Sequence, residues 1–130
     1  MTQDMYASES KERWGNTAAY KESQKRLAGY SKEDIAKAQL AMQEATHIVL
    51  AAMQAGLPAD SDQATSGAEA HRMSISDYWY ECSYEIHKGL ASMYLADPRF
   101  TAHYEAQKVG LAKYIHDAII ANALQKSQGF

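Results

Sequence analysis

Apolar residues recur every three or four positions through most of the chain, which predicts helices that each bury one face. The clearest run follows Ser31-Lys32-Glu33-Asp34, where a hydroxyl residue and a carboxylate three positions later predict a capping box. Gly56-Leu57-Pro58 predicts the end of this helix. Its apolar stripe consists of Ile35, Ala38, Met42, Ala45, Val49, Ala52 and Met53.

Further helix starts follow at regular intervals. Asp60-Ser61, Ser83 and Asp97-Pro98 supply N-cap residues, and Gly110 separates the last helix from the turn before it. The helix after Ser83 has a narrow polar arc, so we expect it at the centre of the core. In the last helix, Ile120 and Leu124 lie off the main apolar stripe, which predicts burial on two sides. No segment shows the alternation of a strand, and the predicted fold class is therefore all-α.

The first thirty residues differ from the rest. Their only residues among Ile, Val, Leu and Met are Met1, Met5 and Leu27. Asn16-Thr17 predicts a helix cap, and the helix would run through Lys25, but it has little apolar surface with which to offset its ordering entropy. We therefore expect a marginally ordered helical segment over 1–30, a helical core over 31–126 and a tail over 127–130.

Length and charge restrict the class of protein. The 130 residues suit one domain, and a formal net charge of -3 gives no basic face for nucleic acid. No apolar stretch is long enough to span a membrane, and no signal peptide is recognisable. The single Cys82 excludes an intramolecular disulfide and is compatible with a cytoplasmic location.

The five histidines do not form a recognisable metal motif. Two histidines never occur four positions apart, and Glu44 and His47 are a lone Glu-x-x-His pair opposite the apolar stripe of their helix. We therefore expect these two side chains to face water. The sequence predicts no metal, haem or other cofactor.

Three features leave a structural and a functional interpretation open. His71 and His87 each lie on an apolar face, where a histidine either bridges two helices or donates to a ligand in a cleft. Cys82 precedes a predicted helix, so it is either a small buried residue or a nucleophile with a lowered pKa. A dense aromatic band is either core packing or the wall of a site for a flat ligand, and consists of Tyr78, Trp79, Tyr80, Tyr84 and Tyr94.

Motifs along most of the chain resemble the TipAS antibiotic-recognition domain. The resemblance runs from about residue 9 to 124. It is carried by Glu12-Arg13-Trp14-Gly15-Asn16-Thr17-x-x-Tyr20-x-x-Ser23, Tyr30-Ser31-Lys32-Glu33-Asp34, His71-Arg72, Tyr80-x-Cys82-x-Tyr84-Glu85-Ile86-His87, Leu90-x-x-Met93-Tyr94-x-x-Asp97-x-Arg99-Phe100, Gly110-Leu111-Ala112 and Asp117-Ala118-Ile119-x-Ala121-Asn122-Ala123.

This resemblance implies a globin-like helical domain without haem that captures thiopeptides or other large multidrug-type antibiotics. In the family it is usually the effector half of a MerR-type transcription activator, and its N-terminal part is mobile until a ligand orders it. The present chain would be an excised effector domain or a stand-alone domain that sequesters the drug. It would not bind DNA or a membrane itself.

The resemblance also identifies a departure at Gly89. Thiopeptide-capturing members resemble a His-x-Cys-Leu pattern, in which the thiolate adds to a dehydroalanine of the ligand. The corresponding residues here are His87-Lys88-Gly89-Leu90, so covalent capture at position 89 is impossible. Cys82 matches a different position of the family.

We therefore expect a ligand-binding module whose N-terminal segment folds as it binds. The candidate ligand-binding residues are Trp14, Tyr20, Tyr30, His71, Trp79, Tyr80, Cys82, His87 and Tyr94. We expect no catalytic residue. Two alternatives remain, namely an enzyme that modifies a drug through Cys82 and His87, and a module that only binds another protein.

Overall fold

The computed structural model describes the backbone of residues 18–129 and the side chains of residues 21–126. This part of the chain is helical and contains no strand, which confirms the predicted all-α class. The helices are α2 (Ala18–Ala28), α3 (Lys32–Gln54), α4 (Asp62–Tyr78), α5 (Tyr84–Ala96), α6 (Pro98–Glu105) and α7 (Leu111–Gly129).

The predicted helix starts at Ser31, Ser61, Ser83 and Asp97 are confirmed, whereas the cap predicted at Asn16-Thr17 lies outside the described residues. The hydroxyl of Ser31 accepts a hydrogen bond from the Asp34 amide at 3.1 Å, and the Asp34 carboxylate accepts one from the Ser31 amide at 3.0 Å, so the capping box is complete. At the starts of α4, α5 and α6, the side chains of Ser61, Ser83 and Asp97 each accept a hydrogen bond from a backbone amide of the first turn.

A cap that the sequence pattern does not reveal starts α7. The carboxylate of Glu105, at the end of α6, accepts hydrogen bonds from the amides of Gly110 at 2.9 Å and Ala112 at 3.0 Å. These bonds hold the pKa of Glu105 below its usual range. Gly110 has a φ of 93°, a left-handed conformation that favours glycine at this turn.

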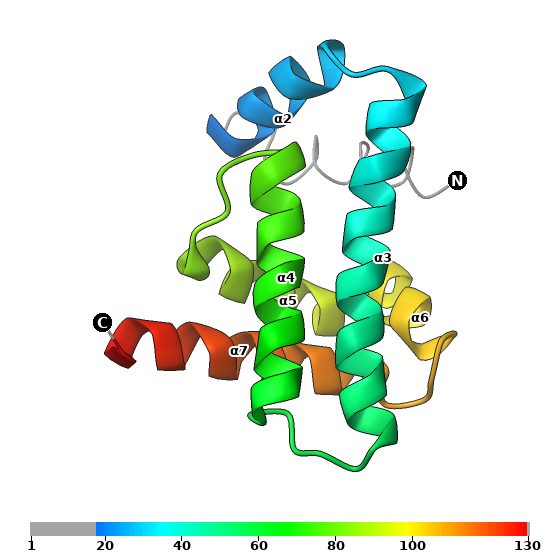
Figure 1. Ribbon diagram of the computed structural model, residues 1–130, viewed down its shortest axis with the longest axis vertical. Helices are drawn as coiled ribbons and strands as arrows, with labels where there is room; N and C mark the ends of the chain where they lie inside the picture. The colour runs from blue at the N-terminus through cyan, green and yellow to red at the C-terminus, as the bar shows by residue number, and fades with distance from the viewer. Residues whose placement is uncertain (1–17, 130) are drawn as a thin grey trace.

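The helices form two crossed layers (Figure 1). The front layer is the α3–α4 hairpin, and α5 and α7 cross behind it. The short helix α6 packs against α5 and α7, while α2 lies across one end of the hairpin.

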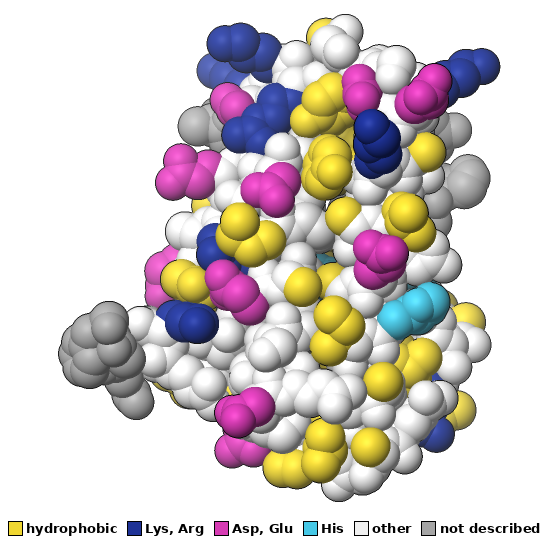
Figure 2. All heavy atoms as spheres, in the orientation of Figure 1, with side chains coloured by type: hydrophobic (Ala, Val, Ile, Leu, Met, Phe, Trp, Pro, Cys, Tyr) yellow, Lys and Arg dark blue, Asp and Glu magenta, His cyan; other side chains and the backbone are white. Residues whose placement is uncertain are grey.

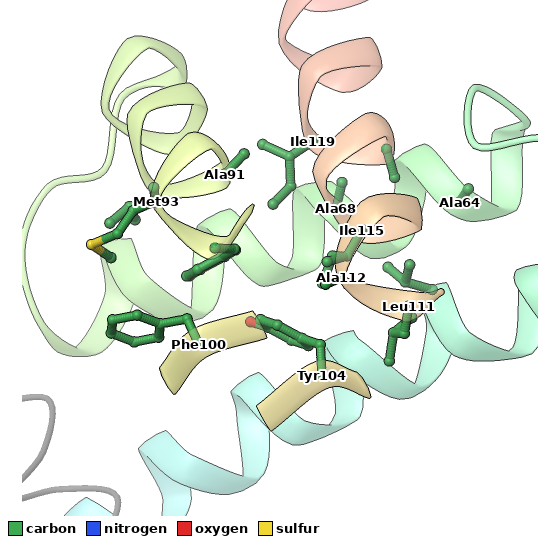
Figure 3. Packing of buried hydrophobic residues seen from close by; sticks show 14 of the residues in the cluster. Ala64, Ala68, Ala91, Met93, Phe100, Tyr104, Leu111, Ala112, Ile115 and Ile119 are labelled. Atoms are coloured by element: carbon green, nitrogen blue, oxygen red, sulfur yellow. The ribbon is translucent and has the colours of Figure 1, made fainter. Parts of the chain in front are cut away.

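The core lies where α4, α5, α6 and α7 meet (Figure 3). Phe100 of α6 lies below Met93 of α5, and Tyr104 of α6 extends towards the middle of the cluster. The fully buried aliphatic side chains with the largest volumes belong to α7 and are Leu111, Ile115 and Ile119.

Two burial expectations hold only in part. Ile86 and Leu95 of α5 are 38% and 40% exposed, because α5 packs mainly on α7 and α6 and one of its sides remains uncovered. In α7, Ile120 packs against the core, but Leu124 is 50% exposed because the C-terminal end of α7 projects beyond the other helices (Figure 1). Glu44 and His47 face solvent, as expected.

The surface carries charges of both signs. On the face in Figure 2, Asp and Glu side chains are interspersed with Lys and Arg along the hairpin, and hydrophobic side chains lie between them. Within residues 18–129, no helix is long and apolar enough to cross a bilayer.

Candidate functional site

Two buried histidines join α4 to α5. His71 Nδ1 and His87 Nε2 lie 2.9 Å apart, and the two imidazole rings are stacked with their centroids 5.2 Å apart. Tyr104 of α6 extends the contact, because its hydroxyl lies 3.4 Å from His71 Nε2. Both histidines are fully buried, and this burial lowers the pKa of each. The pair therefore consists of two neutral rings.

The hydrogen bonds of this pair are incomplete at one end. His87 Nδ1 has no hydrogen-bond partner among the described residues. His71 uses both ring nitrogens, so it bridges helices in the manner of a structural core histidine. Tyr94, another candidate residue, packs its ring edge against His71 with centroids 6.0 Å apart.

A network around Glu69 lies beside the histidines and draws three helices together. Its carboxylate accepts from Arg72 of α4, from the hydroxyl of Tyr84 of α5 at 3.2 Å and from the amide of Asn122 of α7 at 3.0 Å. Burial alone would raise the pKa of Glu69, but the hydrogen bonds from Arg72 and Asn122 outweigh it and hold the value at about 2. Glu69 is therefore ionised at neutral pH.

Arg72 links this network to the loop between α4 and α5. Its guanidinium donates to the carbonyl of Cys82 at 2.7 Å and stacks on the Tyr84 ring, 4.2 Å from the centroid. Arg72 belongs to the His71-Arg72 motif, but no pattern in the sequence assigns a role to Arg72 or Glu69. Both lie on the polar side of an amphipathic helix, where helical spacing alone predicts solvent exposure.

Cys82 has the properties of a structural cysteine. It is buried, and its thiol lies 3.8 Å from the carbonyl of Ser83. Burial raises the pKa of the thiol to about 12 against the opposing charge of Arg72. A nucleophile needs the thiolate, so the structure favours the interpretation of Cys82 as a small buried residue.

Tyr30 lies against Trp79 where α2 meets the α4–α5 loop, and Tyr80 is the next residue of that loop. Trp79 and Tyr80 are half-buried and follow α4 directly, and Tyr30 follows α2. The rings of Tyr30 and Trp79 meet edge to face with centroids 6.2 Å apart. Burial raises the pKa of Tyr80, so its hydroxyl is neutral. We refer to Tyr30, Trp79 and Tyr80 as the aromatic group.

The structure therefore divides the candidate residues into two sets. The first is the half-buried aromatic group, and the second is buried and comprises His71, Cys82, His87 and Tyr94. Trp14 and the side chain of Tyr20 lie outside the described part of the chain. Within the described residues, no group of three or more His, Cys, Asp and Glu side chains is placed to hold a metal ion.

Position 89 is open. Gly89 lies on the exposed side of α5, and a Cβ atom built on it would meet no heavy atom within 4 Å. Among the described residues, a Cβ atom therefore fits here without displacing a neighbour.

Comparison with known proteins identifies the family. Residues 6–122 match the TipAS antibiotic-recognition domain. The HTH-type transcriptional activator TipA of Streptomyces coelicolor is 48% identical over 122 residues, which cover 94% of this chain and 48% of that protein. The HTH-type transcriptional activator mta of Bacillus subtilis is 34% identical over 119 residues, which cover 91% and 45% of the two chains. The chain thus spans about half the length of these relatives.

A solved structure agrees with the sequence matches. The complex of the thiopeptide nosiheptide with TipAS from Streptomyces lividans superposes with a TM-score of 0.85 at 47% identity. The match covers 95% of this chain and 87% of that one. It confirms the globin-like arrangement of helices expected from the sequence. The chain belongs to the TipAS antibiotic-recognition domain family.

Proposed function

We propose that this chain is an antibiotic-binding module that captures thiopeptide-like or other large multidrug-type antibiotics. One observation carries the proposal: the fold matches the nosiheptide complex of TipAS with a TM-score of 0.85 along nearly the whole chain. In this proposal the domain acts in the cytoplasm, either alone as a sequestering protein or as the effector half of a MerR-type activator. The DNA contacts would then belong to another part of such a protein.

We assign ligand contact mainly to the aromatic group, together with Trp14 and Tyr20. Tyr30, Trp79 and Tyr80 are half-buried, so each presents part of an aromatic ring that a flat heteroaromatic ligand can stack against. His71, His87, Cys82 and Tyr94 are buried and support the scaffold behind this surface. Tyr30→Ala and Trp79→Ala should each weaken nosiheptide binding by about 1–3 kcal/mol, as measured by calorimetry.

Binding should be reversible, unlike covalent capture by a cysteine. Position 89 carries no side chain, and Cys82 is buried with a thiol pKa of about 12. After incubation with nosiheptide, denaturing mass spectrometry should therefore recover the chain and the antibiotic at their separate masses.

Gly89→Cys tests this assignment directly. The new thiol would project into open space, and its thiolate would add to a dehydroalanine double bond while the neighbouring carbon takes a proton from water. We expect a mass increase equal to the whole antibiotic in Gly89→Cys and none in the matched control Gly89→Ser. An adduct on the natural chain would contradict reversible capture. A Gly89→Cys variant that binds nosiheptide but never forms an adduct would show that position 89 does not face the reactive part of the ligand.

Ligand binding should also order the N-terminal segment, residues 1–30. Coupled folding and binding uses part of the interaction energy for ordering, about 2–5 kcal/mol. Adding nosiheptide should raise the helical signal in circular dichroism and slow proteolysis within residues 1–30. Unchanged circular dichroism and proteolysis at saturating nosiheptide would argue against this coupling.

The same mixtures distinguish binding from catalysis. A drug-modifying enzyme acting through Cys82 and His87 would need a thiolate, which the buried environment of Cys82 opposes. We therefore expect nosiheptide to be recovered chemically intact after prolonged incubation. A modified or hydrolysed product that disappears in Cys82→Ser would establish the enzyme instead.

A further inference from the structure

Met73 is the most exposed methionine in the part of the chain that the structure describes. It lies on α4 and is 39% exposed, whereas Met93 is 8% exposed and Met42 and Met53 are half-buried against the core. A thioether sulfur that solvent reaches can be oxidised to the sulfoxide. Among the described methionines, Met73 is therefore the first that a dissolved oxidant meets.

The Met73 sulfur also has a cation beside it. Nη2 of Arg72 lies 3.3 Å from Met73 Sδ and donates a hydrogen bond to it. The same nitrogen donates to the Glu69 carboxylate at 2.7 Å. Because this guanidinium nitrogen carries two hydrogens, one of them serves Glu69 and the other serves the sulfur.

Arg72 is held in this position by further partners. Its Nε donates to Glu69 at 3.2 Å, its Nη1 donates to the Cys82 carbonyl at 2.7 Å, and its plane stacks on the Tyr84 ring. The Arg72 side chain is only 14% exposed. A methionine on an ordinary surface is surrounded by water, but Met73 lies against a cation that cannot easily turn away.

We propose that Met73 is an oxidation site for hydroperoxides and that Arg72 binds the resulting sulfoxide. The sulfur lone pair attacks one oxygen of the peroxide, an S–O bond forms and the O–O bond breaks. With hydrogen peroxide, the departing hydroxide takes the proton of the transferred hydroxyl and leaves as water. Sulfur loses two electrons and the peroxide gains them. These residues lie outside the aromatic group, so the proposal holds whether or not thiopeptides are the ligand.

Oxidation should strengthen an existing contact rather than break one. A sulfoxide oxygen accepts hydrogen bonds far better than a thioether sulfur does, and a bond from a charged donor is about twice as strong as one between neutral groups. Rotation about the Cγ–Sδ bond of Met73 brings this oxygen to the Arg72 hydrogen that faces the sulfur, and Glu69 keeps its own. Arg72 also holds the Cys82 carbonyl, so the sulfoxide should tighten the α4–α5 loop, residues 79–83.

Limited oxidation of the full chain by hydrogen peroxide, followed by peptide mass mapping, tests the site. We expect Met73 to be oxidised about threefold to tenfold faster than the other described methionines, because solvent reaches it more readily. A Met73 that is oxidised no faster than these residues would overturn the proposal. Met1 and Met5 lie outside the described residues and do not enter the comparison.

The stereochemistry of the product separates the Arg72 contact from simple exposure. Arg72 donates to one lone pair of the sulfur, so the peroxide should reach only the other and form one of the two sulfoxide epimers in excess. Two reductases, each specific for one epimer, measure that ratio on the peptide containing Met73 after digestion. Oxidation in urea is the control and should give nearly equal epimers. Equal epimers from the folded chain would show that Arg72 does not hold the sulfur and would overturn the proposal.

Two substitutions test the effect on the loop. Met73→Gln places an amide oxygen within reach of Arg72 as a stand-in for the sulfoxide, and Met73→Leu is the matched control without an acceptor. Hydrogen–deuterium exchange is read at Trp79, Tyr80 and Cys82, whose amides are hydrogen-bonded. It should slow about threefold to tenfold in the oxidised natural chain and in Met73→Gln, the factor expected from gaining one ordinary hydrogen bond. Peroxide should leave it unchanged in Met73→Leu, which retains Cys82 and every other methionine.

Two results would overturn the binding of the sulfoxide by Arg72. Unchanged or faster exchange in the loop of the oxidised natural chain would show that the sulfoxide gains no bond there. A peroxide effect of equal size in Met73→Leu would assign the change to another residue. Neither measurement contains an antibiotic, so these outcomes are separate from those that test the proposed function.

Discussion

His71 and His87 make stability depend on pH in a range where few other groups titrate. Burial lowers the pKa of both rings from 6.5, so as the pH falls the unfolded chain binds protons that the folded chain does not. Stability is therefore full above the unfolded pKa and declines below it. Between about pH 7 and pH 5 the free energy of unfolding should fall by roughly 2–4 kcal/mol. Urea denaturation at three pH values measures this slope, and a flat profile would show that the rings are protonated in the folded state.

Glu69 makes a different contribution at lower pH. Its pKa is lowered to about 2, so its stabilising effect is present above the unfolded value of 4.5 and is lost as the pH falls towards 2. Glu69→Gln should lower the free energy of unfolding by about 1–3 kcal/mol at neutral pH, because Arg72 loses its charged partner. The exposed Glu85, paired with Lys88, provides the control: Glu85→Gln should cost under about 1 kcal/mol. Equal losses would mean that the Glu69 network contributes no more than a surface ion pair.

Individual residues also show which features the helical spacing of a sequence can predict and which it cannot. His71 and His87 stood out because each interrupts an apolar stripe, and both prove buried. Glu69, Arg72 and Glu105 could not be selected, because carboxylates and guanidinium groups on polar helix faces are normally solvated. Their partners lie on other helices or across a turn, and only the folded arrangement brings those partners near.

At the scale of elements, Gly67 sets how closely α3 and α4 approach. A Cβ atom at this position would lie 2.7 Å from Val49 Cγ2 and 3.0 Å from the Val49 backbone nitrogen. Gly67→Ala should therefore lower the free energy of unfolding by about 1–3 kcal/mol, although alanine favours a helix by about 1 kcal/mol. Gly89→Ala in α5 meets open space and should raise stability by up to about 1 kcal/mol. The opposite signs in urea denaturation check the prediction, and a stabilised Gly67→Ala would mean that the two helices separate easily.

The residues at which the helices start could be predicted from the sequence. Which side chains each helix buries could be predicted only in part. The caps at Ser31, Ser61, Ser83 and Asp97 follow from local chemistry, and local chemistry is fully present in the sequence. The central place in the core expected of α5 was reached by only part of its surface, because burial depends on how many neighbours a helix has. The spacing of apolar residues shows which face of a helix is apolar, but it does not show how many neighbouring helices cover that face.

At the scale of the whole molecule, the resemblance to the TipAS family predicted how the helices are arranged, which the spacing of apolar residues does not reveal. The pattern of apolar positions predicted helices, but a globin-like arrangement depends on long-range packing between them. The aromatic band was equally compatible with core and with ligand surface. The structure separates it, because Tyr94 is buried while Trp79 and Tyr80 are partly exposed beside Tyr30.

The division between residues 1–30 and the core leads to a final prediction. The described side chains of residues 21–30 are not buried, and Arg26 and Tyr30 are among those that bond to α4. A chain that begins at Ser31 should therefore keep cooperative unfolding and lose no more than about 2 kcal/mol of stability, the contribution of two hydrogen bonds. It should nevertheless fail to bind nosiheptide, because it lacks Tyr30 and the other aromatic residues of the first segment. Urea denaturation and calorimetry on the two chains measure both quantities, with Tyr30→Ala in the full chain as the control for a single lost ring. A shortened chain that is unfolded would show that the first segment is part of the core, whereas one that binds nosiheptide normally would remove this segment from the proposed site.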